Sequence, residues 1–234
     1  MHNAPGPGGA LGEARPGIVV LAGVNGAGKS SVVGESVRDR GGAYFNPDEA
    51  TKRFLEANPD MSQADANSAA WLQGKRLLQW AISEGLAFAF ETTRGGATIT
   101  NLLNDAMNAG MEVHVVYVGL QTAELHIARV RARVARGGHD IPEQKIRERY
   151  DKSRQHLIEL LPRLASLDVY DNSIETPPKQ AQPNLLPILS MEHGEIIHMA
   201  TPHSVPEWAK SIVMTAITIQ RDSTKRQADA GQSR

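Results

Sequence analysis

The sequence contains no cysteine among its 234 residues. This absence excludes disulfide bonds, thiol catalysis and cysteine-ligated metal sites. An excess of charge of one sign is also missing, because 25 Lys and Arg stand against 26 Asp and Glu and the formal net charge is −1. This balance does not indicate a globally basic nucleic-acid-binding protein, although a local basic patch would not show in the total. Nucleic acid is therefore not the expected partner.

Long hydrophobic runs are absent as well. No apolar stretch approaches the roughly 18 residues that a membrane-spanning helix requires. Residues 1–16 are rich in Gly, Pro and Ala and lack the basic start and apolar centre of a signal peptide. We expect this leader and the polar tail 221–234 to be disordered. The default expectation is a soluble cytoplasmic protein without a membrane partner.

One stretch carries clear chemistry. Residues 23–30 read GVNGAGKS and match G-x-x-x-x-G-K-[ST], the P-loop or Walker A motif. Its glycines permit backbone dihedrals that a side chain would block, so that main-chain N–H groups turn inward on a phosphate. Lys29 would place a charge on the β- and γ-phosphates, and the Ser30 hydroxyl would ligate Mg²⁺. ATP and Mg²⁺ are thus the expected cofactors. The predicted nucleotide-binding residues are Asn25, Gly26, Ala27, Gly28, Lys29, Ser30 and Ser31.

Predicted strands and helices alternate along most of the chain. Apolar runs predict strands over 17–22, 43–45, 86–90, 111–120 and 167–170. Helical patterns lie between them, over 31–37, 48–57, 63–83, 97–108, 122–136 and 141–165. Such alternation predicts an α/β fold, specifically a three-layer P-loop NTPase sandwich with a five-stranded, mainly parallel sheet over residues 17–173.

The pattern changes after residue 173. Residues 176–184 form a link rich in Pro and Gln. Residues 185–190 and 195–198 are able to pair as a hairpin, and 206–220 reads as a helix. We therefore expect residues 174–220 to be a short C-terminal extension packed on the same domain.

Polar residues follow several predicted strands, at the sheet edge where ligands bind in such folds. Asp48 follows the second strand, where it would either accept a proton from a substrate hydroxyl or serve only as an acidic residue at a helix start. Glu91, Thr92 and Thr93 follow the central strand and would either bind substrate or simply cap the next helix. By contrast, Trp71 and Trp80 are predicted to lie in the core.

Three arginines share one face of the predicted helix 122–136. Arg129, Arg133 and Arg136 are spaced i, i+4, i+7. Like charges at this spacing destabilise a helix by a few tenths of a kcal/mol (~0.2–0.5) each unless an anion lies against them. The flexible Gly137-Gly138 follows at once. We therefore favour a lid that closes on ATP over a merely solvated face.

Taken in order, these segments resemble a known family. They are AGVNGAGKS (22–30), NPD (46–48), FETT (90–93), YVGL (117–120) and RVARGGHDIP (133–142). The set resembles the zeta toxin-like P-loop kinases, and in particular a branch often labelled predicted ATPases. The resemblance covers about Ile18 to Ser173.

The resemblance implies a small-molecule kinase that transfers the ATP γ-phosphate to a hydroxyl, which in zeta toxins belongs to UDP-N-acetylglucosamine. It implies that Asp48 and Lys29 are catalytic and that Arg136 is the lid arginine. A second phosphate-contacting arginine would be Arg129 or Arg133. It further implies that Glu91 and Thr93 face the substrate.

One segment departs from the family pattern. Zeta toxins present an acidic residue to the sugar from the helix before the central strand, whereas this chain has Lys75 and Arg76 there. A cation in that place favours an acidic or phosphorylated acceptor, so both residues are added to the expected substrate-binding set. Two other functions stay open: a nucleotide-gated ATPase or switch acting on a protein partner, and a nucleic-acid end kinase. One chain alone does not determine whether an antitoxin-like partner exists.

Overall fold

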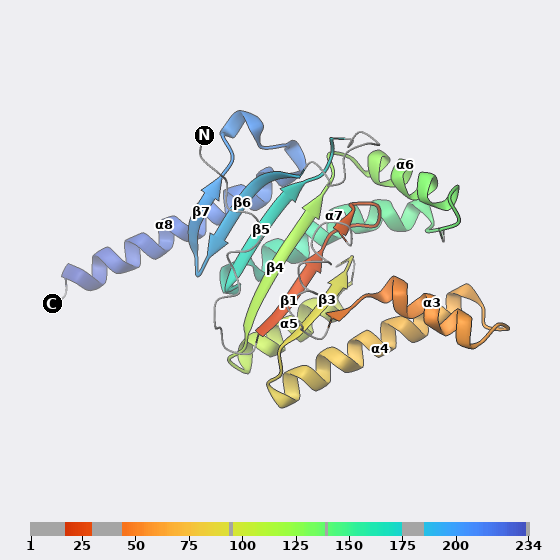
Figure 1. The fold of residues 1–234 in the computed structure, drawn as a ribbon. Coiled ribbons are helices and arrows are strands. Elements are labelled where there is room, and N and C mark those ends of the chain that lie inside the picture. The colour runs from red at the N-terminus through yellow and green to blue at the C-terminus, as the bar shows by residue number, and fades with distance from the viewer. Residues whose placement is uncertain (1–16, 30–43, 94–95, 139, 175–184, 233–234) are drawn as a thin grey trace.

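The computed structural model describes residues 17–29, 44–93, 96–138, 140–174 and 185–232, and Figure 1 shows their arrangement. A single sheet with strand order β2-β3-β1-β4-β5-β6-β7 runs through this part of the chain. Five of its strands are parallel: β1 (Gly17–Ala22), β2 (Tyr44–Phe45), β3 (Phe88–Thr92), β4 (Glu112–Gly119) and β5 (Ser166–Asp171). The last two, β6 (Leu186–Glu192) and β7 (Glu195–Met199), pair antiparallel.

The helices follow the sheet in alternation, as expected. They are α3 (Pro47–Ala57), α4 (Gln63–Glu84), α5 (Ala97–Asn108), α6 (Ala123–Val134), α7 (Glu143–Leu160) and α8 (Lys210–Gln232). Short 3-10 turns cover Leu161–Arg163, Pro202–Ser204 and Glu207–Ala209. In Figure 1, α5, α7 and α8 lie in a row on one face of the sheet, while α3 and α4 flank the β2–β3 edge.

Capping side chains explain where several helices begin. The side chains of Asn46, Ser62 and Thr122 each accept a hydrogen bond from a backbone N–H in the first turn of α3, α4 and α6. Such caps satisfy donors that the helix itself leaves unpaired. The α4 helix ends at Gly85, whose φ of 62° is left-handed. Local residue types therefore set these boundaries.

The α/β class with a mainly parallel sheet is confirmed, but the predicted strand number was wrong. The sheet has seven strands rather than five, because the expected hairpin does not stand apart: β6 pairs with β5 and extends the sheet. The predicted disordered tail was also wrong in part, since α8 continues to Gln232. The leader 1–16, the helix expected over 31–37 and the link 176–184 lie outside the described residues.

A buried tryptophan joins the C-terminal segment to the main sheet. Trp208 packs on Tyr117 of β4 with ring centroids 5.9 Å apart, and its indole Nε1 donates to Asp171 Oδ1 over 3.2 Å. A Cβ on Gly119 would lie 2.5 Å from the Trp208 ring, so only glycine leaves room for it. Residues of α8, such as Ile212 and Ala216, belong to the same hydrophobic core as β1 and β4. The segment 205–216 thus packs on the same core as the main sheet.

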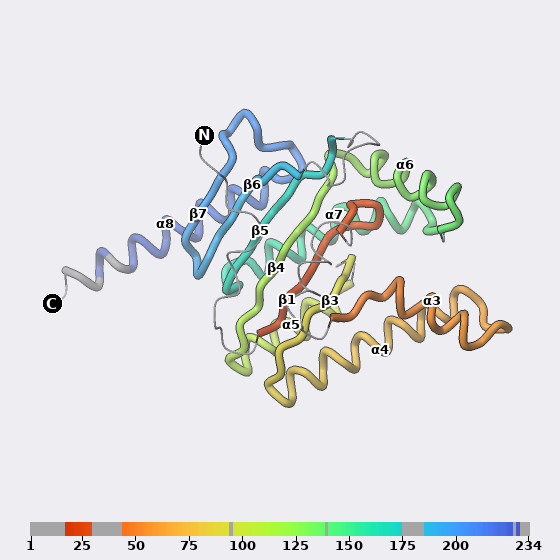
Figure 2. The backbone as a smooth tube through the Cα atoms, viewed as in Figure 1, coloured from red at the N-terminus to blue at the C-terminus, as the bar shows by residue number. Residues whose placement is uncertain are grey.

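The loop after β1 is anchored by a second, smaller core. Val24 of this loop packs with Ile127 and Val130 of α6 and with Ile141 and Ile146 from the α7 side. Figure 2 shows the loop lying at the end of β1, next to α7. This contact ties the loop to α6, the helix of the expected lid, and to the start of α7.

A buried histidine completes this anchor. His126 of α6 is almost fully buried, and its Nδ1 donates to the Asn25 carbonyl oxygen over 2.9 Å. The pKa of His126 is lowered to about 4, mainly by burial; the Asn25 contact opposes this shift, and the nearby cations Lys29, Arg129 and Arg154 contribute to it. The ring is therefore neutral at pH 7, with its proton on Nδ1.

The packing of Trp208 predicts a large effect on stability. Trp208→Ala should lower the free energy of unfolding by about 3–5 kcal/mol, because it removes a buried indole and leaves a cavity. Trp80→Ala is the matched control, since Trp208 is 3% exposed and Trp80 is 57% exposed. Urea unfolding followed by circular dichroism measures both. Equal and small losses in the two variants would contradict the docking of the C-terminal segment.

The neutral state of His126 predicts a pH-dependent stability. Its pKa is lower in the folded state than in the unfolded state, so protons bind the unfolded chain first as the pH falls through about 6.5. Between pH 7 and pH 5 the wild-type protein should lose about 2 kcal/mol more unfolding free energy than His126→Gln, which does not titrate there. Urea unfolding at both pH values tests this. Identical pH dependence in the two proteins would show that His126 already binds a proton when folded.

Candidate active site

The loop after β1 has the backbone that a phosphate requires. Gly23, Gly26 and Gly28 have φ values of 144°, 81° and 86°. A Cβ on Gly23 would lie 2.2 Å from the Val118 carbonyl oxygen, and one on Gly28 would lie 2.6 Å from Asn172 Nδ2. The predicted need for glycine at these positions is confirmed. Only glycine takes this backbone path without a collision, and such a path is typical of phosphate-binding loops.

Asn172, directly after β5, holds this loop by a hydrogen bond. Asn172 Nδ2 donates to the Ala27 carbonyl oxygen over 2.8 Å, and both groups are buried. The contact joins residues 145 positions apart in the chain. It fixes the loop against the sheet edge and explains why the polar residues after β5 lie near the loop.

Lys29 lies in a buried ion pair rather than in solvent. Its Nζ is 3.5 Å from Glu91 Oε1, and the two side chains are only 6% and 11% exposed. Glu91 Oε2 also accepts from Tyr44 Oη over 3.0 Å and from Asn46 Nδ2 over 2.9 Å. A buried carboxylate with this many donors is held in one orientation. Glu91 therefore sets the position of the P-loop lysine.

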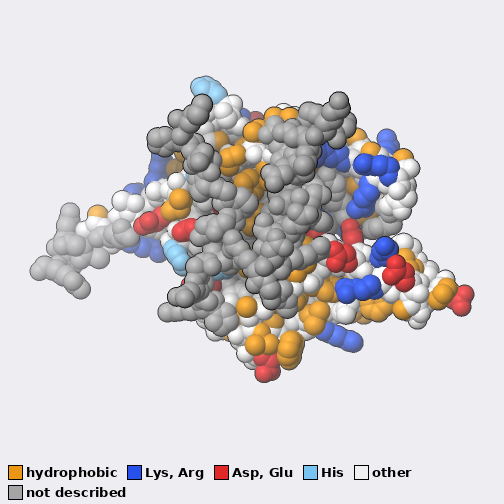
Figure 3. Space-filling view, viewed as in Figure 1, with side chains coloured by type: hydrophobic (Ala, Val, Ile, Leu, Met, Phe, Trp, Pro, Cys, Tyr) orange, Lys and Arg blue, Asp and Glu red, His pale blue; other side chains and the backbone are white. Residues whose placement is uncertain are grey.

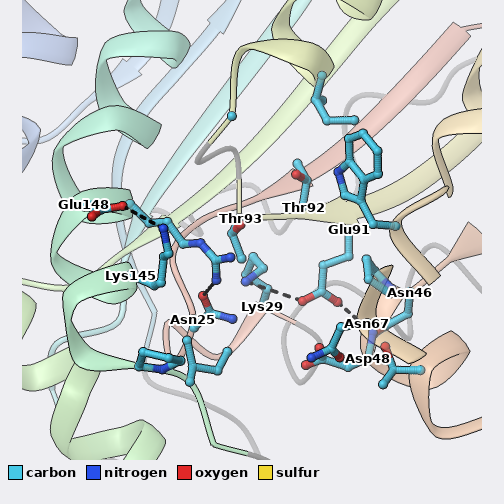
Figure 4. Close-up of a pocket in the computed structure, with 18 of the residues that line it drawn as sticks. Asn25, Lys29, Asn46, Asp48, Asn67, Glu91, Thr92, Thr93, Lys145 and Glu148 are labelled. Atoms are coloured by element: carbon cyan, nitrogen blue, oxygen red, sulfur yellow. Dashed lines mark hydrogen bonds and ion pairs between the residues drawn. The ribbon is translucent and has the colours of Figure 1, made fainter. Parts of the chain in front are cut away.

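A cavity of about 530 Å³ opens beside this pair (Figure 4). Its wall combines the P-loop, the starts of α3 and α5, one face of α4, the end of β3, the lid segment and α7. The lining residues are Asn25, Lys29, Asn46, Pro47, Asp48, Thr51, Asn67, Trp71, Glu91, Thr92, Thr93, Gly96, Thr98, Ile99, Asp140, Ile141, Pro142, Lys145, Glu148 and Arg149. One space thus reaches both Lys29 and Asp48, which the sequence assigned to donor and acceptor chemistry.

Asp48 stands at the first turn of α3. Its backbone N–H donates to Asn46 Oδ1 over 2.8 Å, so Asp48 belongs to the capped first turn. Its carboxylate lies 3.4 Å from Arg133 Nη1, with side chains 56% and 36% exposed respectively. Asp48 also lines the cavity, where its carboxylate oxygens are able to accept a hydrogen bond from a ligand.

The three predicted lid arginines occupy different places. Arg133 contacts Asp48, and the Arg129 Cβ would lie 3.5 Å from a Cβ on Gly26, beside the P-loop. Arg136 follows the end of α6 and its Nε donates to the Ala132 carbonyl oxygen over 3.1 Å. Arg136 is exposed and is not part of the cavity wall. Arg133 thus contacts a cavity residue and the Cβ of Arg129 lies beside the P-loop, but none of the three arginines is among the lining residues.

Sequence reasoning missed two cations that α7 supplies to the cavity, the exposed Lys145 and the partly buried Arg149. Arg149 Nη1 donates to Asn25 Oδ1 over 2.7 Å. Burial lowers the pKa of Arg149, and the carboxylates of Asp48 and Glu148 oppose that shift. A signal was present in the sequence, because Arg149 shares the inward face of α7 with Ile146 and Ser153. A charged residue on the buried face of a helix indicates a partner in the interior.

The face of α4 that meets the cavity differs from the expected one. Asn67 and Trp71, one turn apart, line the wall, whereas Lys75 and Arg76 do not. Lys75 Nζ lies 5.7 Å from the centroid of the Trp71 ring, one turn further along the helix. The prediction that Trp71 and Trp80 are core residues was wrong, because both are exposed.

Thr92 and Thr93 line the cavity directly after β3, as their place in the sequence suggested. Ser30 and Ser31, the expected Mg²⁺ ligand and its neighbour, lie outside the described residues. Oxygen donors suited to Mg²⁺ are nevertheless present, since the Asp48 and Glu91 carboxylates line the P-loop side of the cavity. Among the residues with described positions, no three His, Asp or Glu side chains gather in a metal-binding cluster.

None of the described helices is both long and apolar enough to cross a membrane.

Solved structures with a similar fold include complexes of AvrRxo1-ORF1 with AvrRxo1-ORF2. The AvrRxo1-ORF1:AvrRxo1-ORF2 complex with sulphate ions superposes with a TM-score of 0.63 at 14% identity, over 87% of this chain and 64% of that chain. The native form of the complex gives a TM-score of 0.63 over 92% of this chain and 75% of that chain. This chain thus spans less than two thirds of the first of these structures, and the likeness shows a shared fold.

Sequence comparison identifies the family. A protein of Haemophilus influenzae described as uncharacterized is 30% identical over 132 residues, which cover 56% of this chain and 91% of the relative. The family model described as Zeta toxin matches residues 10–176, more than half of the chain. This match includes the P-loop, the residues after β3 and the arginines of α6. The chain therefore belongs to the zeta toxin family of P-loop kinases.

Proposed function

We propose that this protein transfers the γ-phosphate of ATP to a hydroxyl group of a small molecule. One observation carries the proposal: a single cavity of about 530 Å³ is lined by both Lys29 of the phosphate-binding loop and Asp48 at the start of α3. The first residue suits the phosphate donor, and the second suits a hydroxyl acceptor. A site with only the first would bind a nucleotide without a place for an acceptor.

Several observations support ATP as the donor. The positive φ values of the loop glycines open its backbone to phosphate, and Lys29 stands beside it. A solved complex of similar fold, AvrRxo1-ORF1:-ORF2, contains ATP, with a TM-score of 0.62. Mg²⁺ bound with the nucleotide would neutralise phosphate charge, and Ser30 is the residue expected to hold it.

The chemical step follows from the position of Asp48. The acceptor oxygen attacks the γ-phosphorus, the bond from that phosphorus to the bridging oxygen of ADP breaks, and the hydroxyl proton passes to the Asp48 carboxylate. Arg133, whose Nη1 lies 3.4 Å from Asp48 Oδ2, orients this carboxylate. The reaction needs little base strength, so positioning of the hydroxyl is the larger part of the role of Asp48.

Cations on two sides of the cavity would stabilise the transferring phosphoryl group. Lys29 lines the cavity from the loop and Arg149 lines it from α7, while Arg129 and Arg133 of α6 lie outside the lining, next to Gly26 and Asp48 respectively. Negative charge spreads over the phosphoryl oxygens in the transition state, where fixed arginine forks are most effective. Arg136 joins this set only if the lid turns inward, which is the lid motion expected from its sequence.

The acceptor side of the cavity is polar with one aromatic wall. Asn67, Thr92 and Thr93 offer hydrogen bonds, and Trp71 offers a flat apolar face. A sugar or nucleotide sugar such as UDP-N-acetylglucosamine has the hydroxyl groups and ring faces that fit such a wall. Lys75, beside Trp71, would meet an acidic or phosphate group carried by the acceptor.

Two other functions receive less support. A nucleic-acid end kinase needs a continuous basic groove, whereas charged side chains of both signs gather over α3 and α6 in Figure 3. A nucleotide-gated switch would hydrolyse ATP in response to a protein, and Asp48 would then have no acceptor to bind.

Incubation with ATP, Mg²⁺ and a panel of nucleotide sugars and metabolites, read by mass spectrometry for one added phosphoryl group, tests the proposal directly. ATP hydrolysis without any phosphorylated acceptor would favour the switch.

The role of Asp48 leads to a prediction for Asp48→Asn. Transfer should fall about 10²–10⁴-fold, because the carboxylate that accepts and positions the hydroxyl is lost. ATP binding should stay within about twofold, since the loop contacts are unchanged. Transfer is measured with radiolabelled ATP and binding by calorimetry. Glu49→Gln removes a neighbouring carboxylate outside the cavity and serves as the control; if both variants transfer phosphate at the wild-type rate, Asp48 has no part in the step.

The aromatic wall leads to a second prediction. Trp71→Ala should raise the KM for the acceptor about tenfold while the KM for ATP stays constant, because Trp71 lines only the acceptor side. Trp71 is 46% exposed, so the substitution leaves the core intact. Trp80→Ala is the matched control on the same helix. An equal rise in both KM values would show that Trp71→Ala disturbs the structure of the whole site and does not act on acceptor binding specifically.

A further inference from the structure

Arg149 is held by a side chain of the P-loop itself. Its Nη1 donates to Asn25 Oδ1 over 2.7 Å, across 124 positions of sequence. Asn25 is buried, and Arg149 is partly buried where α7 lines the cavity. Figure 4 shows the Asn25 side chain beside the cavity next to Lys29. The contact therefore lies at the phosphate end of the site.

Asn25 is itself fixed by its surroundings. Its carbonyl oxygen accepts from His126 Nδ1 over 2.9 Å. The preceding residue, Val24, packs into the small core formed with α6 and α7. The loop, α6 and α7 thus converge on one residue, and the Asn25 carboxamide is a rigid support for the arginine.

The chemical type of this support matters. A carboxylate in place of Asn25 would neutralise Arg149 and repel phosphate, as Glu91 neutralises Lys29 in the structure. A carboxamide oxygen orients the guanidinium by a hydrogen bond and leaves its full positive charge. An arginine also loses much rotational freedom when it is fixed, so holding it before the nucleotide arrives removes that loss from the reaction.

We propose that Asn25 is a positioning residue, whose side chain holds the Arg149 guanidinium at the phosphate end of the cavity before the nucleotide binds. This inference rests on the proposed function, because it assigns Arg149 to the transferring phosphate. The P-loop then has two tasks: its backbone cradles the phosphates, and its Asn25 side chain orients a cation supplied by α7.

A double-mutant cycle tests this coupling. Asn25→Ala should lower kcat for phosphoryl transfer about tenfold, which corresponds to about 1.4 kcal/mol, while the KM for ATP changes less than about threefold. In the Arg149→Ala background the same substitution should reduce kcat less than about twofold further, because the residue through which it acts is gone. Asn25→Ser, whose hydroxyl is too short to reach the guanidinium, should repeat the result and serves if the alanine variant does not fold.

The chain offers a matched control for this cycle. Arg163 Nη1 donates to Asn104 Oδ1 over 2.8 Å, an arginine–asparagine contact of the same kind that is not part of the cavity wall. Asn104→Ala should leave kcat unchanged. An unchanged kcat in Asn25→Ala would overturn the proposal. So would a double variant whose fold-loss in kcat equals the product of the fold-losses in Asn25→Ala and Arg149→Ala.

Failure of this inference is separable from failure of the proposed function. Calorimetry with the non-hydrolysable ATP analogue AMPPNP and urea unfolding are performed on the same four proteins. A wild-type protein that neither binds AMPPNP nor transfers phosphate would refute the kinase function and, with it, a catalytic task for Asn25. A wild-type protein that transfers phosphate normally, with an Asn25→Ala variant equal to it, would refute only the positioning role.

Discussion

The structure depends on the backbone path of the loop after β1. Gly23 and Gly28 take φ values of 144° and 86°, and a side chain on either would collide with β4 or with Asn172. This path turns main-chain N–H groups toward a single point. The remaining elements fix that point: β5 supports the loop through Asn172, and α6 supports it through His126. The loop on which we expect the phosphates to bind is thus held mainly by uncharged side chains, Asn172 and His126.

The charged groups of the site are paired before any ligand enters. Lys29 pairs with Glu91, and Asp48 pairs with Arg133. Each pair keeps a buried or half-buried charge stable and sets its direction. A nucleotide that reaches the loop therefore meets groups already oriented, and it exchanges partners with them rather than ordering them. Orienting the groups in advance lowers the entropic cost of the reaction. In return, each group has a protein partner that competes with the ligand for it.

Much of the fold could be predicted from the sequence because the signals are local. The strand at 17–22 and the helix at 97–108 have the expected bounds, and the caps at Ser62 and Thr122 follow from residue type. The number of strands and the length of α8 could not be predicted in this way. The β6–β7 hairpin joins the sheet only because β6 pairs with β5. The length of α8 likewise depends on the tertiary contacts of that helix and not on its residue types alone.

The sequence by itself determined the glycine-rich loop with its lysine and the zeta toxin family, and it predicted a role for Asp48, since each depends on residue types at fixed short spacing. Only the tertiary structure decided that Arg149 belongs to the cavity, that Trp71 forms a wall while Lys75 and Arg76 stand outside the lining, and that Glu91 holds Lys29. These contacts join residues far apart in the chain, such as Asn25 and Arg149. Chain folding brings such pairs together through packing of whole elements, which no local pattern encodes.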